Sequence, residues 1–167
     1  MRMTRGLFAF IMLVGCTPAL ETRPSFRDLS VPITSVALFD PAQFAGHWDV
    51  IASYQGSVCG LDVVVAKAGV LALAQRGCSG DVSQSVAQVS GPGRYTPESG
   101  ANADMEHWVM WVDQTYRTAV IGTVGGEFGM ILNRGRGIPA DRMAAAREIL
   151  DWNGYDLARL VKRSNGG

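Results

Sequence analysis

Residues 39–48 read Phe39-Asp-Pro-Ala-Gln-Phe44-Ala-Gly46-His-Trp48, and they lead into the first strand expected in this chain. The folded domain opens just before them, near Val36. Gly46 lets the backbone turn tightly, because glycine reaches conformations that other residues avoid. Trp48 begins an apolar run that continues to Tyr54, and its side chain is expected to point inward. The stretch therefore predicts a tight turn that leads into a β-strand.

Short apolar runs follow at close spacing and alternate with turn residues. They cover residues 48–54, 61–67, 70–77, 82–89, 107–112, 118–124 and 128–134. Such runs are typical of a meander of antiparallel strands. The signal is weakest between Cys78 and His107, where a strand near 83–90 is clear and one near 94–96 is marginal. Three outcomes stay open there: a small barrel, a barrel that is partly open on this side, or one that a partner completes.

The hydrophobic period changes after Pro139. Met143, Ala146, Ile149 and Leu150 recur at the spacing of one helix face, and Asn153-Gly154 marks the end of the helix. Residues 157–161 are one more strand candidate. Many strands followed by one helix predict an all-β fold. We expect a single small antiparallel up-and-down β-barrel of about eight strands, with the C-terminal α-helix packed outside.

The N-terminus has the layout of a secretory signal. Arg2 and Arg5 precede an apolar run, residues 6–14, that is too short to span a bilayer, and Gly15 and Cys16 follow. We therefore expect a lipoprotein signal peptide over 1–15, a lipid-anchored tether over 16–35, a globular domain over 36–163 and a disordered tail over 164–167. An ordinary signal peptide with an incidental cysteine, or a weak membrane anchor, is the alternative.

The composition is that of an exported globular domain. The chain has 15 basic and 15 acidic residues and no basic run, which argues against nucleic-acid binding. Of its 3 cysteines, Cys59 and Cys78 remain as a pair if Cys16 carries lipid. A hairpin that pairs Lys67 with Val70 would place these two opposite each other, so a disulfide is expected in an oxidising compartment. A redox-active pair is the alternative, and no metal site is expected, because no histidine lies nearby.

Four motifs, taken in order, resemble those of the lipocalins, and specifically of the bacterial outer-membrane lipocalins. Residues 39–48 match their F-D-x-x-x-[FY]-x-G-x-W opening, and residues 113–120 match their D-x-x-Y-R-x-A-[LV] segment. Residues 130–134 resemble their strand that ends in arginine, and residues 154–156 match the G-[FY]-D after their C-terminal helix. Leu13-Val14-Gly15-Cys16 looks like a bacterial lipobox, in which the cysteine is acylated. The resemblance covers about residues 36–163.

In the family these motifs close one end of the barrel. The resemblance gives this role to Gly46, Trp48, Tyr116 and Arg134. Arg134 is expected to lie over the indole of Trp48 in a cation–π contact and to donate to carbonyls of the closing turn. We expect these residues to keep the fold rather than to bind a ligand.

Alternation along the strands gives the candidate calyx positions. Either residues 107, 109 and 111 or residues 108, 110 and 112 face inward, and each set contains a tryptophan. The candidate ligand-binding residues are Val50, Ala52, Tyr54, Trp108, Trp111, Phe128, Met130 and Leu132. This set is mostly apolar, which suits an acyl chain. A core that these side chains fill completely is the alternative.

The resemblance implies binding, storage or transport of a small hydrophobic ligand, such as a fatty acid of the palmitate type or a lysophospholipid. We expect no enzymatic activity, because no G-x-S-x-G, H-E-x-x-H or phosphate-loop motif occurs. His47 is expected to point outward, and His107 is the candidate for the haem ligation that a few lipocalins show. Otherwise we expect no cofactor and no metal.

The expected location is the bacterial cell envelope. The acyl chains on Cys16 would hold the protein on the outer membrane, with the periplasmic side favoured. Thr17, rather than Asp, follows the cysteine, which by the family's sorting pattern points to the outer membrane. Self-association as a homodimer stays open. The alternative function is a filled or incomplete barrel that binds protein partners as an envelope lipoprotein.

Overall fold

The computed structural model describes residues 23–100 and 102–163. The signal peptide over 1–15, the acylation site Cys16 and the tail over 164–167 lie outside the described residues. The expectations for these segments therefore stay predictions.

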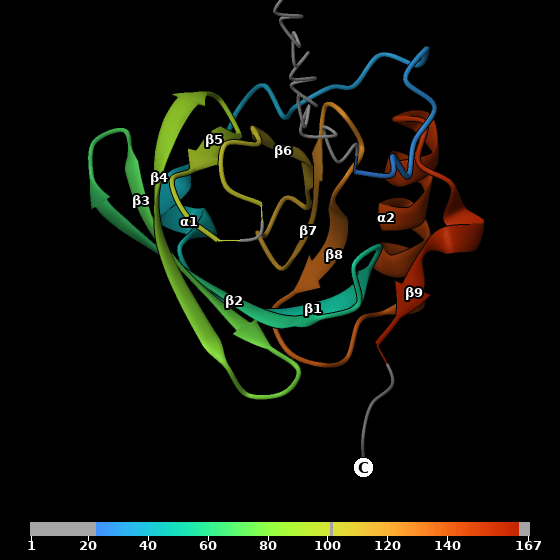
Figure 1. Cartoon of the computed structure of the whole chain (residues 1–167). Coiled ribbons are helices and arrows are strands. Elements are labelled where there is room, and N and C mark those ends of the chain that lie inside the picture. Colours follow the sequence, from blue (N-terminus) through green and yellow to red (C-terminus); the bar gives the residue numbers. More distant parts are fainter. Residues whose placement is uncertain (1–22, 101, 164–167) are drawn as a thin grey trace, which may run out of the picture.

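The described chain forms one antiparallel sheet that closes on itself as a barrel (Figure 1). Its strands are β1 (Gly46–Ser53), β2 (Val58–Lys67), β3 (Val70–Gly77), β4 (Val82–Gly91), β5 (Arg94–Pro97), β6 (His107–Val112), β7 (Thr118–Thr123), β8 (Gly129–Asn133) and β9 (Val161–Lys162). They are hydrogen-bonded in the order β2-β3-β4-β5-β6-β7-β8-β1-β9, and β2 also pairs with β1, which closes the ring. The predicted antiparallel barrel is confirmed, with β9 as an additional strand beside β1.

Within the described residues, two α-helices and one short 3-10 helix accompany the strands. They are α1 (Pro41–Phe44), α2 (Ala140–Trp152) and the 3-10 helix η1 (Leu157–Arg159). Figure 1 shows α2 lying against the outside of the barrel, where it contacts β7 and β6. The predicted position of the C-terminal helix is therefore confirmed.

The strand β5 closes the barrel where the sequence signal is weakest. It pairs with β4 and, through two residue pairs, Arg94↔Trp108 and Tyr95↔His107, with β6. The amide of Val109 also donates to the carbonyl of Gly93 over 2.7 Å. The described residues thus form a closed barrel without a partner chain. The ladder between β5 and β6 has the fewest residue pairs in the ring.

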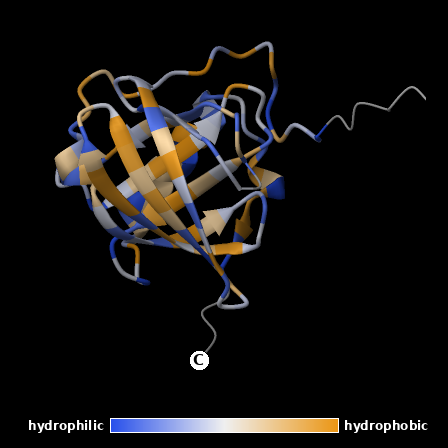
Figure 2. Ribbon diagram, turned by 60° about the vertical axis from the view of Figure 1, so that its left-hand side comes forward, coloured by the Kyte–Doolittle hydropathy of each residue, from blue (hydrophilic) through white to orange (hydrophobic). Residues whose placement is uncertain are grey.

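The hydrophobic core has two parts, one inside the barrel and one between the barrel and α2. The helix contributes Ala146 and Leu150 to the outer part, both 0% exposed, and they share this cluster with Val120 of β7 and Ile131 of β8. Every residue of β7 and β8 is buried, because these strands have the barrel interior on one side and α2 on the other. Figure 2 shows hydrophobic and hydrophilic residues interchanging along strands of the barrel wall.

Residues 25–35 pack on the domain, and the expected tether over 16–35 is wrong for this part. Arg27 is 9% exposed, and its guanidinium donates to the carbonyls of Asn153 (2.9 Å), Val124 (2.7 Å) and Val31. Phe26 packs on Tyr54, with their ring centroids 5.1 Å apart. In Figure 1 this segment (blue) runs from α2 across to α1. A buried cation satisfied by three carbonyls makes the segment part of the fold.

The strand expected over 157–161 is wrong for most of its length. Leu157–Arg159 form η1, because the side chain of Asp156 caps its start and accepts from the amide of Ala158 over 2.9 Å. Only Val161–Lys162 is a strand, and it pairs with the end of β1.

Candidate ligand-binding interior

The stretch 39–48 builds the closed end of the barrel. Asp40 caps α1 by accepting from the amides of Ala42 (2.9 Å) and Gln43 (3.4 Å), and Pro41 occupies the first helical turn. The helix lasts for four residues and ends at Phe44, which is 0% exposed. Its ring lies 5.1 Å from that of Trp48. The end of the capped helix and the start of β1 thus place the rings of Phe44 and Trp48 together at one end of the interior.

Arg134 lies over Trp48 and joins the closing segments. Its guanidinium carbon is 4.1 Å from the centre of the indole ring. It donates to the carbonyls of Gln43 (2.8 Å), Ala45 (2.8 Å) and Tyr116 (3.0 Å). The indole nitrogen of Trp48 donates to the carbonyl of Phe44 over 2.8 Å. Arg134 therefore links the closing turn, which contains Gln43 and Ala45, to the turn between β6 and β7, which contains Tyr116.

Gly46 and Tyr116 occupy backbone conformations with positive φ, at +107° and 52°. A Cβ atom at Gly46 would lie 2.8 Å from Nη1 of Arg134, so this position has neither the room nor the conformation for a side chain. The Tyr116 hydroxyl accepts from the amide of Asp40 over 2.8 Å. The four residues assigned to closure by sequence, Gly46, Trp48, Tyr116 and Arg134, are therefore gathered at one end.

Asp113 holds the turn that carries Tyr116. Its carboxylate accepts from the amides of Arg117 and Thr118, both over 2.6 Å, and from the hydroxyl of Thr115 over 2.6 Å. Burial raises the pKa of Asp113, but these hydrogen bonds outweigh it, and the pKa lies below its usual range.

We expect Asp113→Ala to lower the free energy of unfolding by about 1–2 kcal/mol at pH 7, because two amides lose their acceptor. A carboxyl whose pKa is lower in the folded state stabilises above its unfolded pKa, and this contribution disappears as the pH falls through the folded pKa. The difference between Asp113→Ala and wild type should therefore shrink below about pH 4 in urea unfolding. Asp151→Ala, at an exposed position of α2, is the control, and an equal loss in both variants would contradict the assignment.

Four of the eight candidate calyx residues lie inside the barrel. They are Val50, Phe128, Met130 and Leu132, each at most 1% exposed. Trp48 lies with them, and so does Val109, which belongs to one of the two alternating sets considered for its strand. The inner cluster also contains residues that alternation did not single out, namely Leu61, Val63, Leu71, Leu73, Ala87, Tyr95, Ala119 and Ile121. The alternation of Leu71 and Leu73 could have identified the inward face of β3, whereas Tyr95 stands alone in a very short strand.

The other four candidates lie on the outside, and their assignment to the calyx is wrong. Ala52, Tyr54, Trp108 and Trp111 belong to the outer cluster between the barrel and α2. Two β-bulges explain the outward positions of Ala52, Tyr54 and Trp111, because one extra residue reverses which face the following side chains occupy. Trp108 precedes its bulge and faces outward because it alternates with the inward-facing Val109. In β1 the register shifts between Val50 and Ala52.

The second bulge lies in β6, between Val109 and Trp111. His107 and Val109 face inward before it, and Val112 contacts the inner cluster after it. Neither of the two alternating sets considered for this strand is therefore correct. Both tryptophans, Trp108 and Trp111, pack outside.

His107 places a polar imidazole ring among aromatic side chains inside the barrel. It is 1% exposed and stacks on Phe128, with ring centroids 4.8 Å apart and an angle of 17° between the planes. The ring of Tyr95 lies 5.3 Å away. Burial lowers the pKa of His107 to about 4, against the opposing effect of a backbone hydrogen bond at Asn102. The imidazole is therefore neutral at physiological pH.

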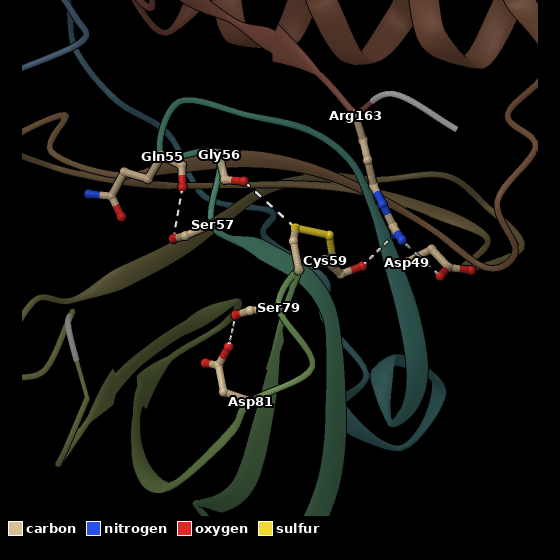
Figure 3. Close-up of a disulfide and its surroundings, with 9 residues drawn as sticks. Asp49, Gln55, Gly56, Ser57, Cys59, Ser79, Asp81 and Arg163 are labelled. Carbon is tan, nitrogen blue, oxygen red and sulfur yellow. Dashed lines mark hydrogen bonds and ion pairs between the residues drawn. A yellow bond between two sulfur atoms is a disulfide. The ribbon is translucent and has the colours of Figure 1, made fainter. Parts of the chain in front are cut away.

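The disulfide between Cys59 and Cys78 is confirmed (Figure 3). It joins β2 to the segment that follows β3, with the two Cα atoms 4.9 Å apart. A register shift between Val58 and Gly60 accommodates Cys59. The carbonyl of Cys59 accepts from Arg163 over 2.8 Å, and Arg163 also lies 3.9 Å from the carboxylate of Asp49. The bridge thus fastens the end of the β2–β3 hairpin, and Arg163 links this hairpin to the C-terminal segment.

A hollow of about 590 Å³ lies beside the disulfide. It occurs where β1 and β2 separate beyond their last shared pair, Asp49↔Gly60. Its lining includes Val50 and Val58, which belong to or contact the inner cluster. Its basic lining residues are Arg136, Lys162 and Arg163. The lining of the hollow therefore combines positively charged side chains, called the basic rim below, with apolar side chains, two of which belong to or contact the inner cluster.

A second hollow, of about 620 Å³, lies on the outer face of β2, β3 and β4 and is lined in part by Val64, Ala72 and Val86. Over residues 23–100 and 102–163, no group of three or more His, Cys, Asp or Glu side chains could hold a metal ion. Within the same residues, no helix has both the length and the apolar composition that a membrane span requires.

A closed up-and-down barrel with an apolar interior, one plugged end and an outer C-terminal helix defines a class of small binding proteins. Residues 85–165 match the family model described as a lipocalin-like domain. This match spans just under half of the chain, and the described residues have the lipocalin fold.

Solved structures share this fold at low sequence identity. The siderocalin Ex-FABP, described as functioning through dual ligand specificities, is 15% identical with a TM-score of 0.59, over 75% of this chain and 96% of its own. Apocrustacyanin C1 is 14% identical with a TM-score of 0.60, over 82% of this chain and 91% of its own. Apocrustacyanin C2 is 14% identical with a TM-score of 0.60, over 86% and 93%. No curated protein sequence matches this chain.

Proposed function

We propose that this protein is an envelope lipocalin that binds one small hydrophobic ligand, a fatty acid or a lysophospholipid, with the acyl chain inside the barrel. The observation that carries the proposal is the hollow beside the disulfide, whose lining combines three basic side chains with Val50 of the inner cluster and Val58, which packs against that cluster. Apolar walls with a few polar groups are typical of sites for such ligands. Binding is then an equilibrium transfer of the chain out of water, without a covalent step.

The rim chemistry supports an amphiphile with an anionic head. Arg136, Lys162 and Arg163 line the hollow together with the apolar Val50 and Val58. A carboxylate or phosphate would meet the cations, and the chain would meet the valines. The interior side chains must shift to admit a chain, and the flexible thioether of Met130 is suited to this.

We also propose that acyl chains on Cys16 hold the domain at the outer membrane, on the periplasmic side. The support is the lipobox-like sequence 13–16 alone. More than one chain on the cysteine would make the attachment long-lived. The intact mass of the chain recovered from membranes tests this part, since Cys16→Ser should lose the mass of the acyl groups.

The binding proposal is tested by native mass spectrometry of the Cys16→Ser chain after exposure to a total envelope lipid extract. The expected result is one added mass that matches a fatty acid or a lysophospholipid. Reversing the rim with Arg136→Glu and Lys162→Glu should reduce the bound fraction. A spectrum without adducts, repeated with palmitate, would contradict the proposal and favour a filled barrel that binds protein partners.

That second candidate has one observation in its favour. The outer hollow along β2, β3 and β4 exposes Val64 (59%) and Val86 (42%) on a sheet face that α2 does not cover. Exposed apolar side chains gathered in one place are a feature of interaction surfaces.

A further inference from the structure

His107 has a ring nitrogen inside the barrel whose hydrogen-bonding capacity is not used by the protein. Its Nε2 atom is buried and has no hydrogen-bond partner within residues 23–100 and 102–163. The ring stacks on Phe128 and lies beside Tyr95, both members of the inner cluster. Buried polar atoms are almost always hydrogen-bonded, so the absence of a partner for Nε2 requires an explanation.

The backbone near His107 determines whether Nε2 is a hydrogen-bond donor or a hydrogen-bond acceptor. A backbone hydrogen bond at Asn102 raises the pKa of His107, which identifies it as a bond from a ring N–H to a carbonyl oxygen. Because Nε2 has no partner, this bond belongs to Nδ1. A neutral imidazole carries one proton, so Nε2 is left as an acceptor.

We propose that Nε2 of His107 accepts a hydrogen bond from a hydroxyl group of the bound ligand, so that the interior selects acyl compounds that carry an uncharged O–H donor. This inference rests on the proposed function. It separates the ligands considered there, because a lysophospholipid carries a free hydroxyl and an ordinary fatty acid, ionised at neutral pH, has no donor to offer.

The arrangement disfavours a carboxylate at this point. A carboxylate has only acceptor atoms and would face the lone pair of Nε2 in an apolar setting. The cation that reaches the inner cluster, Arg134, lies at the opposite, closed end and is occupied by carbonyls and by the indole of Trp48. An anionic head therefore belongs at the basic rim, and a hydroxyl belongs at His107.

The test compares three probes of equal chain length: decanol, decyl methyl ether and decanoate. Affinities are measured by calorimetry at pH 7.5 on the Cys16→Ser chain and on the same chain with His107→Phe. Decanol should bind about tenfold more tightly than the ether, since the ether lacks a donor. In His107→Phe this ratio should fall to about one, while the ether and decanoate keep their affinities.

Two further variants distinguish the loss of the proposed hydrogen bond from the loss of the native fold. His47→Phe changes the other histidine, which lies on the outer surface with its side chain 44% exposed, and should leave the decanol preference unchanged. His107→Gln restores a polar acceptor and should recover part of the preference, provided that circular dichroism shows the native fold.

The outcomes are distinct. Equal affinities for decanol and the ether in the parent chain, or a preference that survives His107→Phe, would overturn the assignment of Nε2 while leaving hydrophobic binding intact. Failure of all three probes to bind would overturn the proposed function together with this inference.

Discussion

Trp48→Ala should lower the free energy of unfolding by about 3–5 kcal/mol, the largest effect expected for a single side chain in this protein. The indole is 0% exposed, packs on Phe44 and lies under the guanidinium of Arg134. Its removal leaves a cavity at the closed end and takes away the face on which Arg134 rests. Urea unfolding followed by circular dichroism measures the loss.

The matched control is Trp152→Ala. Trp152 is 69% exposed at the end of α2, so its removal should change the free energy of unfolding by about 0.5 kcal/mol or less. Trp48→Phe keeps an aromatic face for Arg134 and should lie between the two. Equal losses at Trp48 and Trp152 would show that the closed end is not organised around the buried indole.

Removal of the disulfide should cost about 3 kcal/mol, the second large effect. The bridge closes a loop between residues separated by 19 positions, and a loop of this size restricts the unfolded chain substantially. The double variant Cys59→Ala and Cys78→Ala avoids a free thiol at either position. Its unfolding midpoint in urea, compared with the parent, measures the effect.

Cys16→Ser provides the control for the loss of a cysteine. It lies outside the described domain and should leave the unfolding midpoint unchanged. Reduction of the parent chain with dithiothreitol should reproduce the behaviour of the double variant. A double variant as stable as the parent would contradict a structural role for the bridge and would leave the redox-active alternative open.

Periodicity and turn chemistry predict the main elements of this fold. The apolar runs from 48–54 to 128–134 all fall on strands, the helix after Pro139 forms where its stripe predicts it, and the cysteine pair is joined. The motif at 39–48 also predicts which residues gather at the closed end. These features depend on local sequence, so a single chain contains enough information to predict them.

The errors have physical causes that act over more than one element. Alternation fails at Ile51 and Met110, where an extra residue in one strand is visible only from the pairing with the next. The strand β5 is too short to identify alone, and its partners on both sides stabilise it. Residues 25–35 look like a tether by composition, but Arg27 finds its acceptors on distant segments.

His107 shows the same limit at the site itself. Its sequence position gives a histidine near the start of a strand, without any sign of its surroundings. The stacking on Phe128, the neutral charge state and the unused Nε2 arise from packing between β5, β6 and the residue before β8. Such a polar group becomes apparent only when the barrel is assembled.

The central claim is that a hydrophobic ligand enters the barrel, and two methionines on opposite sides of its wall test it most directly. Met130 lies in the inner cluster at 1% exposed, and Met110 lies in the outer cluster at 5% exposed. We would record methyl NMR spectra of the chain labelled at its methionine methyl groups, assigned through Met130→Leu and Met110→Leu, during titration with decanol. Saturable shifts of the Met130 methyl that exceed those of Met110 are the predicted result. Shifts confined to Met110, or no shift at either methionine up to the solubility limit of decanol, would contradict ligand binding inside the barrel.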